Sequence, residues 1–358
     1  MEGTRTRQVQ VPKRWQQVLA IRTVLTTPAG WLFMLIAALV LTFLAFADRP
    51  SSLSDQENYV AYFRNTNWDW LVLQFHESPS VLRFFISLVT DELGWRSWVI
   101  LANSTGMAPE TGVRLTVLCF NAMIIFALSR LQRPLLGLLL YLVIPIALPT
   151  LVFQIRQGFG FGLAMMFAIV FKRPLLGAII GSSVHTTLAV PAIIMLAFRL
   201  FRHRLMAAIA GASAAAVMLA WVGPLLFRAF GGRRAEIYTV QQDNFSIRLL
   251  ALMILYLAAP ILLLYTTRRE QRSSFQDSLQ TLAVMHIGLI VYLVAAFALF
   301  PFGKDRVWYY VPLLLPFLLP EIRMRNLFVL WTFAGVIALV LIDAVKNYFE
   351  GTYFYFLG

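Results

Sequence analysis

Residues 279–300 read LQTLAVMHIGLIVYLVAAFALF, a run of 22 residues without Asp, Glu, Lys or Arg. A helix of this length extends about 33 Å, enough to cross the hydrocarbon core of a bilayer, which is about 30 Å thick. Similar apolar stretches recur along the chain. We expect membrane spans near 29–47, 113–129, 134–152, 157–171, 205–227, 247–266, 279–300, 307–320 and 326–343.

The composition of the whole chain agrees with these spans. Of its 358 residues 59% are hydrophobic and only 13% are charged, and the apolar blocks leave little room for a separate soluble enzyme domain. The single cysteine, Cys119, excludes an intramolecular disulfide framework and any cysteine-based metal site. We predict an all-α, polytopic membrane bundle of about 10–11 membrane helices. A basic arm at 1–28 precedes one transmembrane domain at 29–358.

The basic residues of the short connections predict the orientation, because cytoplasmic loops carry an excess of Lys and Arg. They place the N-terminal arm inside, together with Arg130 and Arg133, Lys172 and Arg173, Arg268, Arg269 and Arg272, and Arg323 and Arg325. In this topology the cytoplasmic side carries 17 basic and 4 acidic residues, and the external side carries 13 of each. The net charge of +13 is therefore explained by topology, and nucleic acid is not an expected partner.

Two segments leave alternatives. The stretch 174–198 lies between two basic clusters, so we favour two short helices that meet near His185 over a single span. Ala45-Phe46-Ala47 has the form of a signal-peptide cleavage site. We favour an uncleaved first span there, because the apolar segment is long for a signal peptide.

The first external loop, 48–112, differs from the rest of the chain because it holds eight of the 17 acidic residues. A loop of this length is usually functional. Its stretches 55–75 and 80–102 have helix-like apolar spacing interrupted by charges, which is typical of helices that lie along the membrane interface. No internal repeat is evident, and this disfavours a secondary transporter.

Arg156 is the sharpest candidate for a functional residue, because it opens a span on the external side without an acidic neighbour in sequence. Its guanidinium suits phosphate oxygens, so we interpret it as an anion clamp, with snorkelling to lipid headgroups as the alternative. Gly158, Gly160 and Gly162 follow it, and their spacing indicates close helix packing rather than nucleotide binding.

Other candidates lie on the same predicted face. His185 is a candidate base or phosphate donor, with an ordinary bond to a helix carbonyl as the alternative. Arg306, in the last external loop, is a second candidate cation. Spacing at i, i+3, i+4 and i+7 puts four further side chains on one helix face, either as a sugar-binding stripe or as an ordinary amphipathic face: Asp55, Asn58, Tyr59 and Tyr62. No histidine pair has metal-ligand spacing, so we expect neither a metal nor a cofactor.

These positions together resemble the EpsG branch of the Wzy-type polysaccharide polymerases, in order and spacing over residues 29–320. The resemblance rests on Asp55-Gln-Glu-Asn-Tyr-Val-Ala-Tyr, Glu92-Leu-Gly-Trp, Arg156-Gln157, a small-residue run ending in His185, and Asp305-Arg306. It implies a GT-C-like multi-pass enzyme of the bacterial inner membrane with its active face in the periplasm. Such an enzyme joins oligosaccharide repeat units carried on undecaprenyl pyrophosphate, in a membrane that also holds a flippase and a chain-length regulator as partners.

The resemblance and the residues together assign roles. We expect His185, Asp55 and Arg156 to be catalytic, and Arg306, Tyr59, Asn58, Glu92 and Gln157 to bind substrate. Three alternatives remain open: another polyprenyl-dependent GT-C-like glycosyltransferase, a membrane O-acyltransferase, or a carrier or flippase of lipid-linked sugars. A carrier would distribute its charged residues along a continuous path, whereas these gather at one face.

Overall fold

The computed structural model describes residues 56–77, 80–81, 84, 91–145, 154–230, 246–267, 274–300, 304 and 306–350, together with Ile36. All regular secondary structure in these residues is helical, and this part of the chain contains no strand. The predicted all-α class is thereby confirmed. The first predicted span, 29–47, and the candidate Asp55 lie outside the described residues.

Five helical segments are long and apolar enough to cross a membrane, which makes the chain a multi-pass membrane protein. They are α7 (Pro109–Leu128), Leu205–Leu225 of α13 (Leu205–Phe230), Ile247–Thr267, α17 (Ser274–Leu299) and α20 (Leu327–Phe349). The third consists of α15 (Ile247–Leu255) and α16 (Ala258–Thr267), with a turn at Tyr256–Leu257 between them. Pro260 explains this break, because proline has no N–H group to donate to the carbonyl oxygen of Tyr256, four residues earlier, and its ring clashes with that carbonyl.

Shorter apolar helices complete the bundle, and the sequence shows where several of them begin. Proline stands in the first helical turn of α8 (Pro134–Val143) and α11 (Pro174–Val184), where its missing N–H group has no helical partner to lose. The others are α10 (Ile155–Met165), which continues as a π-helix at Met166–Val170, α12 (Ala189–Leu200), and α19 (Tyr310–Leu318), which ends in a 3-10 turn at Leu319–Glu321. The total of 10–11 membrane helices stays a prediction.

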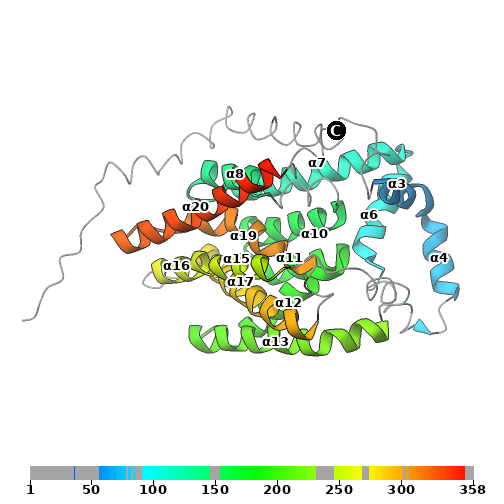
Figure 1. The fold of residues 1–358 in the computed structure, drawn as a ribbon. Helices are drawn as coiled ribbons and strands as arrows, with labels where there is room; N and C mark the ends of the chain where they lie inside the picture. Colours follow the sequence, from blue (N-terminus) through cyan, green and yellow to red (C-terminus); the bar gives the residue numbers. More distant parts are fainter. Residues whose placement is uncertain are drawn as a thin grey trace, which may run out of the picture.

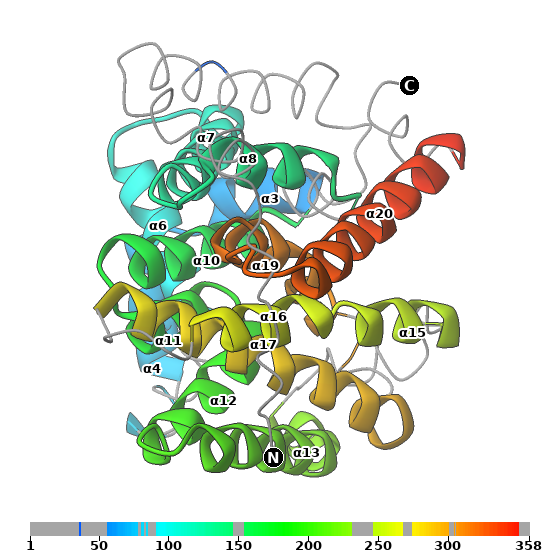
Figure 2. The ribbon, with the colours of Figure 1, turned by 90° about the vertical axis from the view of Figure 1, so that its left-hand side faces the viewer.

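Helix α10 is central to the arrangement, since it packs against both α7 and α11. Figure 2 shows the layers, from α7 and α8 through α10 and α19 to α17, α12 and α13. Helix α20 crosses along one side of the bundle and contacts α16 and α8. The first turns of α10 therefore lie where several helices meet.

Glycines allow α10 and α11 to approach closely. A Cβ atom on Gly160 would lie 2.9 Å from the carbonyl oxygen of Gly181, and one on Gly181 would lie 2.7 Å from the carbonyl oxygen of Gly160. Gly162 faces the other neighbour of α10, where a Cβ atom would lie 3.1 Å from the carbonyl oxygen of Phe120 in α7. The packing interpretation of these glycines is confirmed for Gly160 and Gly162.

Helices α11 and α12 turn back on each other at His185, whose backbone is extended with φ −144° and ψ 115°. The start of α11 and the end of α12 line one cavity of about 640 Å³, with Arg173 on one side and Arg199 and Arg202 on the other. Asp277 in the first turn of α17 lines the same cavity. Both ends of the 174–200 segment thus lie at one end of the bundle, and His185 lies at the other.

Two of the connections that were predicted to be cytoplasmic also meet in space. Arg133, between α7 and α8, donates to the carbonyl oxygen of Ile322 at 2.8 Å. The backbone N–H of Gln132 donates to the buried carboxylate of Glu321 at 2.5 Å. The side of the membrane on which they lie remains a prediction from charge.

The acidic loop 48–112, which was predicted to be external, contains three described helices at one end of the bundle: α3 (Gln56–Asn65), α4 (Trp68–Glu77) and α6 (Leu93–Ser104). Trp95 of α6 is fully buried, and the rings of Tyr59 and Phe63 in α3 each lie 5.9 Å from it. The two helices are therefore packed together. Helix α4 exposes Trp68 and Phe75 by more than half, which suits the interfacial position expected for this loop.

Candidate functional site

Glu92 lies at the centre of a buried polar cluster at the end of the bundle that carries α3 and α6. It immediately precedes α6 and has a left-handed backbone conformation, with φ 61° and ψ 62°, and only 1% of the residue is exposed. A residue other than glycine rarely adopts this conformation, and such strain gathers at functional sites. A buried carboxylate also needs partners for its charge.

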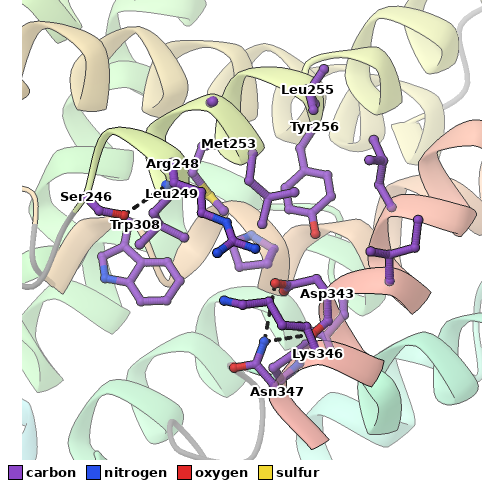
Figure 3. A pocket seen from close by; sticks show the side chains of 17 residues that line it. Ser246, Arg248, Leu249, Met253, Leu255, Tyr256, Trp308, Asp343, Lys346 and Asn347 are labelled. Carbon is purple, nitrogen blue, oxygen red and sulfur yellow. Dashed lines mark hydrogen bonds between the residues drawn. The ribbon is translucent and has the colours of Figure 1, made fainter. Parts of the chain in front are cut away.

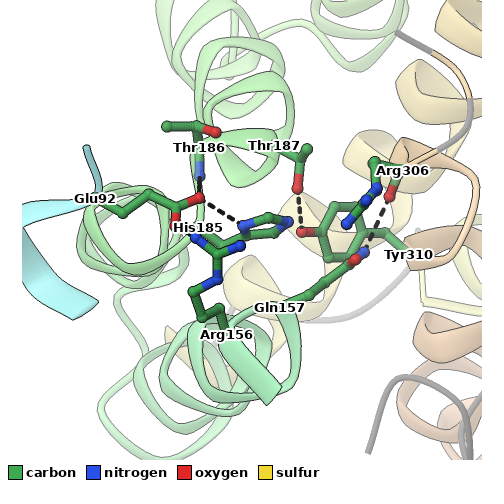
Figure 4. Close-up of polar contacts among 8 residues, drawn as sticks. All are labelled: Glu92, Arg156, Gln157, His185, Thr186, Thr187, Arg306 and Tyr310. Atoms are coloured by element: carbon green, nitrogen blue, oxygen red, sulfur yellow. Dashed lines mark hydrogen bonds and ion pairs between the residues drawn. The ribbon is translucent and has the colours of Figure 1, made fainter. Parts of the chain in front are cut away.

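Three groups from two other parts of the chain supply those partners (Figure 4). Oε1 of Glu92 lies 2.7 Å from Nδ1 of His185 and accepts from the backbone N–H of Thr186 at 3.3 Å. The other oxygen forms an ion pair with the guanidinium of Arg156 in the first turn of α10. One carboxylate thus joins the start of α6, the start of α10 and the turn between α11 and α12.

Gly94 makes this convergence possible. A Cβ atom at this position would lie 3.0 Å from the carbonyl carbon of Ser183 and 3.1 Å from its oxygen, and closer still to its hydroxyl. Only glycine therefore lets α6 approach the last turn of α11. The approach places Glu92 beside His185.

The contact with Glu92 defines the chemistry of His185. A carboxylate accepts hydrogen bonds, so Nδ1 carries the proton and the neutral ring keeps its lone pair on Nε2. Nε2 is buried and has no hydrogen-bond partner among the described residues. It points away from Glu92, toward the side where Thr187, Tyr310 and Arg306 lie (Figure 4). A carboxylate-oriented imidazole of this kind is suited to accept a proton from a hydroxyl group.

Arg156 is held by aromatic rings as well as by Glu92. Its guanidinium carbon lies 5.8 Å from the ring centroid of Tyr59 and 5.3 Å from that of Tyr62. Its Nε atom is buried and has no acceptor within the described part of the chain. The side chain is therefore fixed in place, and its Nε–H group is a buried donor without an acceptor among the described residues.

The turn of α10 that carries Arg156 also contacts the segment before α19. Gln157 donates to the carbonyl oxygen of Arg306 at 2.9 Å. On the same side, the hydroxyls of Thr187 and Tyr310 lie 2.7 Å apart. Arg306 is close enough to His185 to act on it electrostatically. The cluster therefore combines a base, a carboxylate and two guanidinium groups.

Arg96 of α6 joins the helices next to the cluster. Its guanidinium carbon lies 4.4 Å from the ring centroids of both Tyr62 and Trp70, and it donates to the hydroxyl of Thr66 at 2.7 Å. Burial lowers the pKa of Arg96 from its ordinary value, although an arginine still keeps its proton. This side chain connects α6, the helix that follows Glu92, with α3 and α4.

Most of the predicted site residues meet in this cluster. It brings together His185, Arg156, Glu92, Gln157, Arg306 and Tyr59. Asn58 is exposed on α3, and Asp55 lies outside the described residues. Tyr59 is 4% exposed and packs on Trp95 and Arg156, so its ring supports the arginine.

The sequence interpretation missed the way in which these residues pair. Arg156 has no acidic neighbour in sequence, but its partner Glu92 stands 64 positions earlier. Thr186, Thr187 and Tyr310 were not candidates, and no local pattern distinguishes them. Among the described residues, no group of three or more His, Cys, Asp or Glu side chains is arranged to hold a metal ion.

Comparison with protein-family models, with curated proteins and with solved structures finds no match to this chain. The function therefore has to be inferred from the residues and their geometry.

Proposed function

We propose that this protein polymerises oligosaccharide repeat units carried on undecaprenyl pyrophosphate, at the periplasmic face of the bacterial inner membrane. The observation that carries the proposal is the Glu92–His185–Arg156 cluster, which offers a lone pair on His185 Nε2 and an N–H donor on Arg156 Nε. The resemblance to the EpsG branch and to GT-C architecture supplies the substrate class.

The reaction would use the cluster in the following way. Nε2 of His185 accepts the proton of an acceptor hydroxyl, and the resulting oxygen attacks the anomeric carbon of the donor sugar. The new glycosidic bond forms as the bond between that carbon and the pyrophosphate oxygen breaks, and undecaprenyl pyrophosphate leaves. Arg156 and Arg306 stabilise the negative charge that develops on the leaving group.

Glu92 has two tasks in this scheme. It keeps the proton of His185 on Nδ1, and it stabilises the imidazolium that forms when Nε2 is protonated. It also balances the charge of Arg156 between turnovers. Asp55, which lies outside the described residues, remains the other candidate base. The position of the unpaired Nε2 of His185 near the two arginines supports His185 in this role.

The proposal is tested with purified protein and an undecaprenyl-pyrophosphate-linked repeat. Wild-type protein should produce a ladder of longer glycans on a gel. Arg156→Ala should lower the rate by about a hundredfold or more, as expected when a cation that stabilises the leaving group is lost. Arg64→Ala is the matched control, because Arg64 lies in the same external region but pairs with Glu110 at the surface. An unchanged ladder from Arg156→Ala would exclude the assigned role of this arginine.

A second pair of variants identifies the base. His185→Gln should abolish the pH dependence of the rate near neutrality together with most of the activity, whereas Asp55→Asn should keep that pH dependence. The reverse pattern would transfer the role of base to Asp55.

A further inference from the structure

A second cavity, of about 500 Å³, lies between α15, α20 and the segment that leads into α19 (Figure 3). One part of its wall is apolar and comes from residues such as Leu252, Met253 and Leu339. The other part is polar and carries positively and negatively charged side chains. The reaction proposed above does not use this cavity.

The polar groups come from two helices and face the same space. Arg248, in the first turn of α15, lines the cavity opposite Lys346 and Asp343 of α20. Lys346 pairs with Glu350 at 3.2 Å near the end of α20. Asn347 donates to the carbonyl oxygen of Asp343 at 2.7 Å and to its carboxylate at 3.3 Å. The cavity therefore offers two cations, a carboxylate and an amide.

Trp308 connects this cavity to the cluster around Glu92. Its indole lines the cavity and stacks on Tyr309, with the ring centroids 4.5 Å apart and the planes at 23°. Gln154, just before α10, donates to the hydroxyl of Tyr309 at 3.3 Å. The backbone carbonyl oxygen of Arg306, two residues before Trp308, accepts from the side chain of Gln157. One short segment thus has the first site on one side and the second cavity on the other.

We infer that this cavity binds the headgroup of a second lipid-linked glycan, which serves as the acceptor; the inference rests on the proposed function. Arg248 and Lys346 hold a phosphate group of the lipid, as paired cations do in many phosphate sites. Asp343 would repel a bare phosphate, but it accepts hydrogen bonds from sugar hydroxyls, as does the carbonyl of Asn347. The face of Trp308 suits a sugar ring, and the apolar wall suits the lipid chain.

The geometry of the transfer requires such a second site. Donor and acceptor both keep their lipid chains in the bilayer while an acceptor hydroxyl reaches the anomeric carbon of the donor. Their phosphates therefore need separate positions at the same end of the protein. The two sites on either side of residues 306–310 meet this requirement.

The test measures lipid binding by native mass spectrometry of the full chain in detergent. The probes are an undecaprenyl-pyrophosphate-linked repeat, undecaprenyl phosphate and phosphatidylglycerol. Wild-type protein should bind two molecules of the lipid-linked repeat, and the double variant Arg248→Ala/Lys346→Ala should bind the second one roughly tenfold more weakly or worse. Arg64→Ala should behave like the wild type. Asp343→Asn should weaken binding of the glycosylated lipid more than that of undecaprenyl phosphate.

The outcomes separate the two proposals. Unchanged binding by the double variant, with a melting temperature like that of the wild type, would overturn the inference. The inference would also be overturned if phosphatidylglycerol competed for the second site as well as the lipid-linked repeat does, because the cavity would then be an ordinary phospholipid site. If the wild type binds two lipid-linked repeats in this way but forms no ladder, the proposed polymerase activity fails while the second glycolipid site stands.

Discussion

At the scale of single residues, Glu92 determines whether the cluster is assembled. Its side chain and that of Arg156 are 1% and 17% exposed, so each charge is removed from water and depends on the other. Breaking a buried pair costs more than forming it contributes, because the remaining charge has no partner. The same carboxylate orients His185.

We therefore expect Glu92→Gln to affect both stability and activity. The free energy of unfolding should fall by about 3–5 kcal/mol, since Arg156 loses its counter-charge. Polymer formation should fall by about a hundredfold to ten-thousandfold, because His185 loses the group that fixes its proton. Thermal melting in detergent and the ladder assay measure the two effects.

Glu110→Gln is the control for this variant. Glu110 also pairs with an arginine, but the side chains of Arg64 and Glu110 are 62% and 39% exposed, and exposed pairs contribute at most about 1 kcal/mol. Both variants remove one carboxylate from an arginine at the same end of the protein. Equal losses would show that the burial of Glu92 has no special consequence.

The sequence predicted which residues belong to this cluster better than it predicted which of them pair with one another. An arginine at the start of a span and a histidine between two basic clusters are unusual in themselves, so Arg156 and His185 were evident from local pattern. The pairing of Glu92 with Arg156 depends on how α6 meets α10 and α11, and helical periodicity contains no such information. The strained backbone of Glu92 was likewise invisible before the fold was known.

At the scale of helices, the contact between α10 and α11 holds the site together. Arg156 begins one of these helices, and His185 directly follows the other. Their backbones approach at Gly160 and Gly181, where no Cβ atom fits without movement. The close packing therefore controls the distance between the two functional side chains.

Gly160→Ala and Gly181→Ala should each lower stability by about 1–3 kcal/mol, because the added methyl group meets a backbone carbonyl that cannot rotate away. The rate of polymer formation should fall as well, since the helices must separate. Gly335→Ala in α20 is the control, because a Cβ atom there meets nothing within 4 Å. That substitution should be neutral or stabilise by up to about 1 kcal/mol through helix propensity. A destabilised Gly335→Ala together with unaffected Gly160→Ala would contradict the packing argument.

At the scale of the whole molecule, basic residues that were predicted to be cytoplasmic and the candidate functional site lie at opposite ends of the bundle. The cavity that contains Arg173, Arg199 and Arg202 lies at one end, and the cluster of Glu92, Arg156 and His185 lies at the other. The charge rule assigns the first end to the cytoplasm without using any contact. A topology can be predicted from loop charges because it depends on residue counts alone. The break between α15 and α16 was not predicted, although Pro260 is a local signal for it.

The orientation is tested by labelling single cysteines in a background in which Cys119 is replaced by Ala. A membrane-impermeant maleimide should label Ser104→Cys in intact cells, since Ser104 is exposed at the end of α6. Arg173→Cys and His203→Cys, just outside the two ends of the α11–α12 hairpin, should react only after the membrane is opened, because both positions are exposed at the basic end. Labelling of these two positions from opposite sides would exclude the hairpin in the membrane. Labelling of both from outside, with Ser104→Cys protected, would invert the orientation and move the Glu92 cluster to the cytoplasmic face.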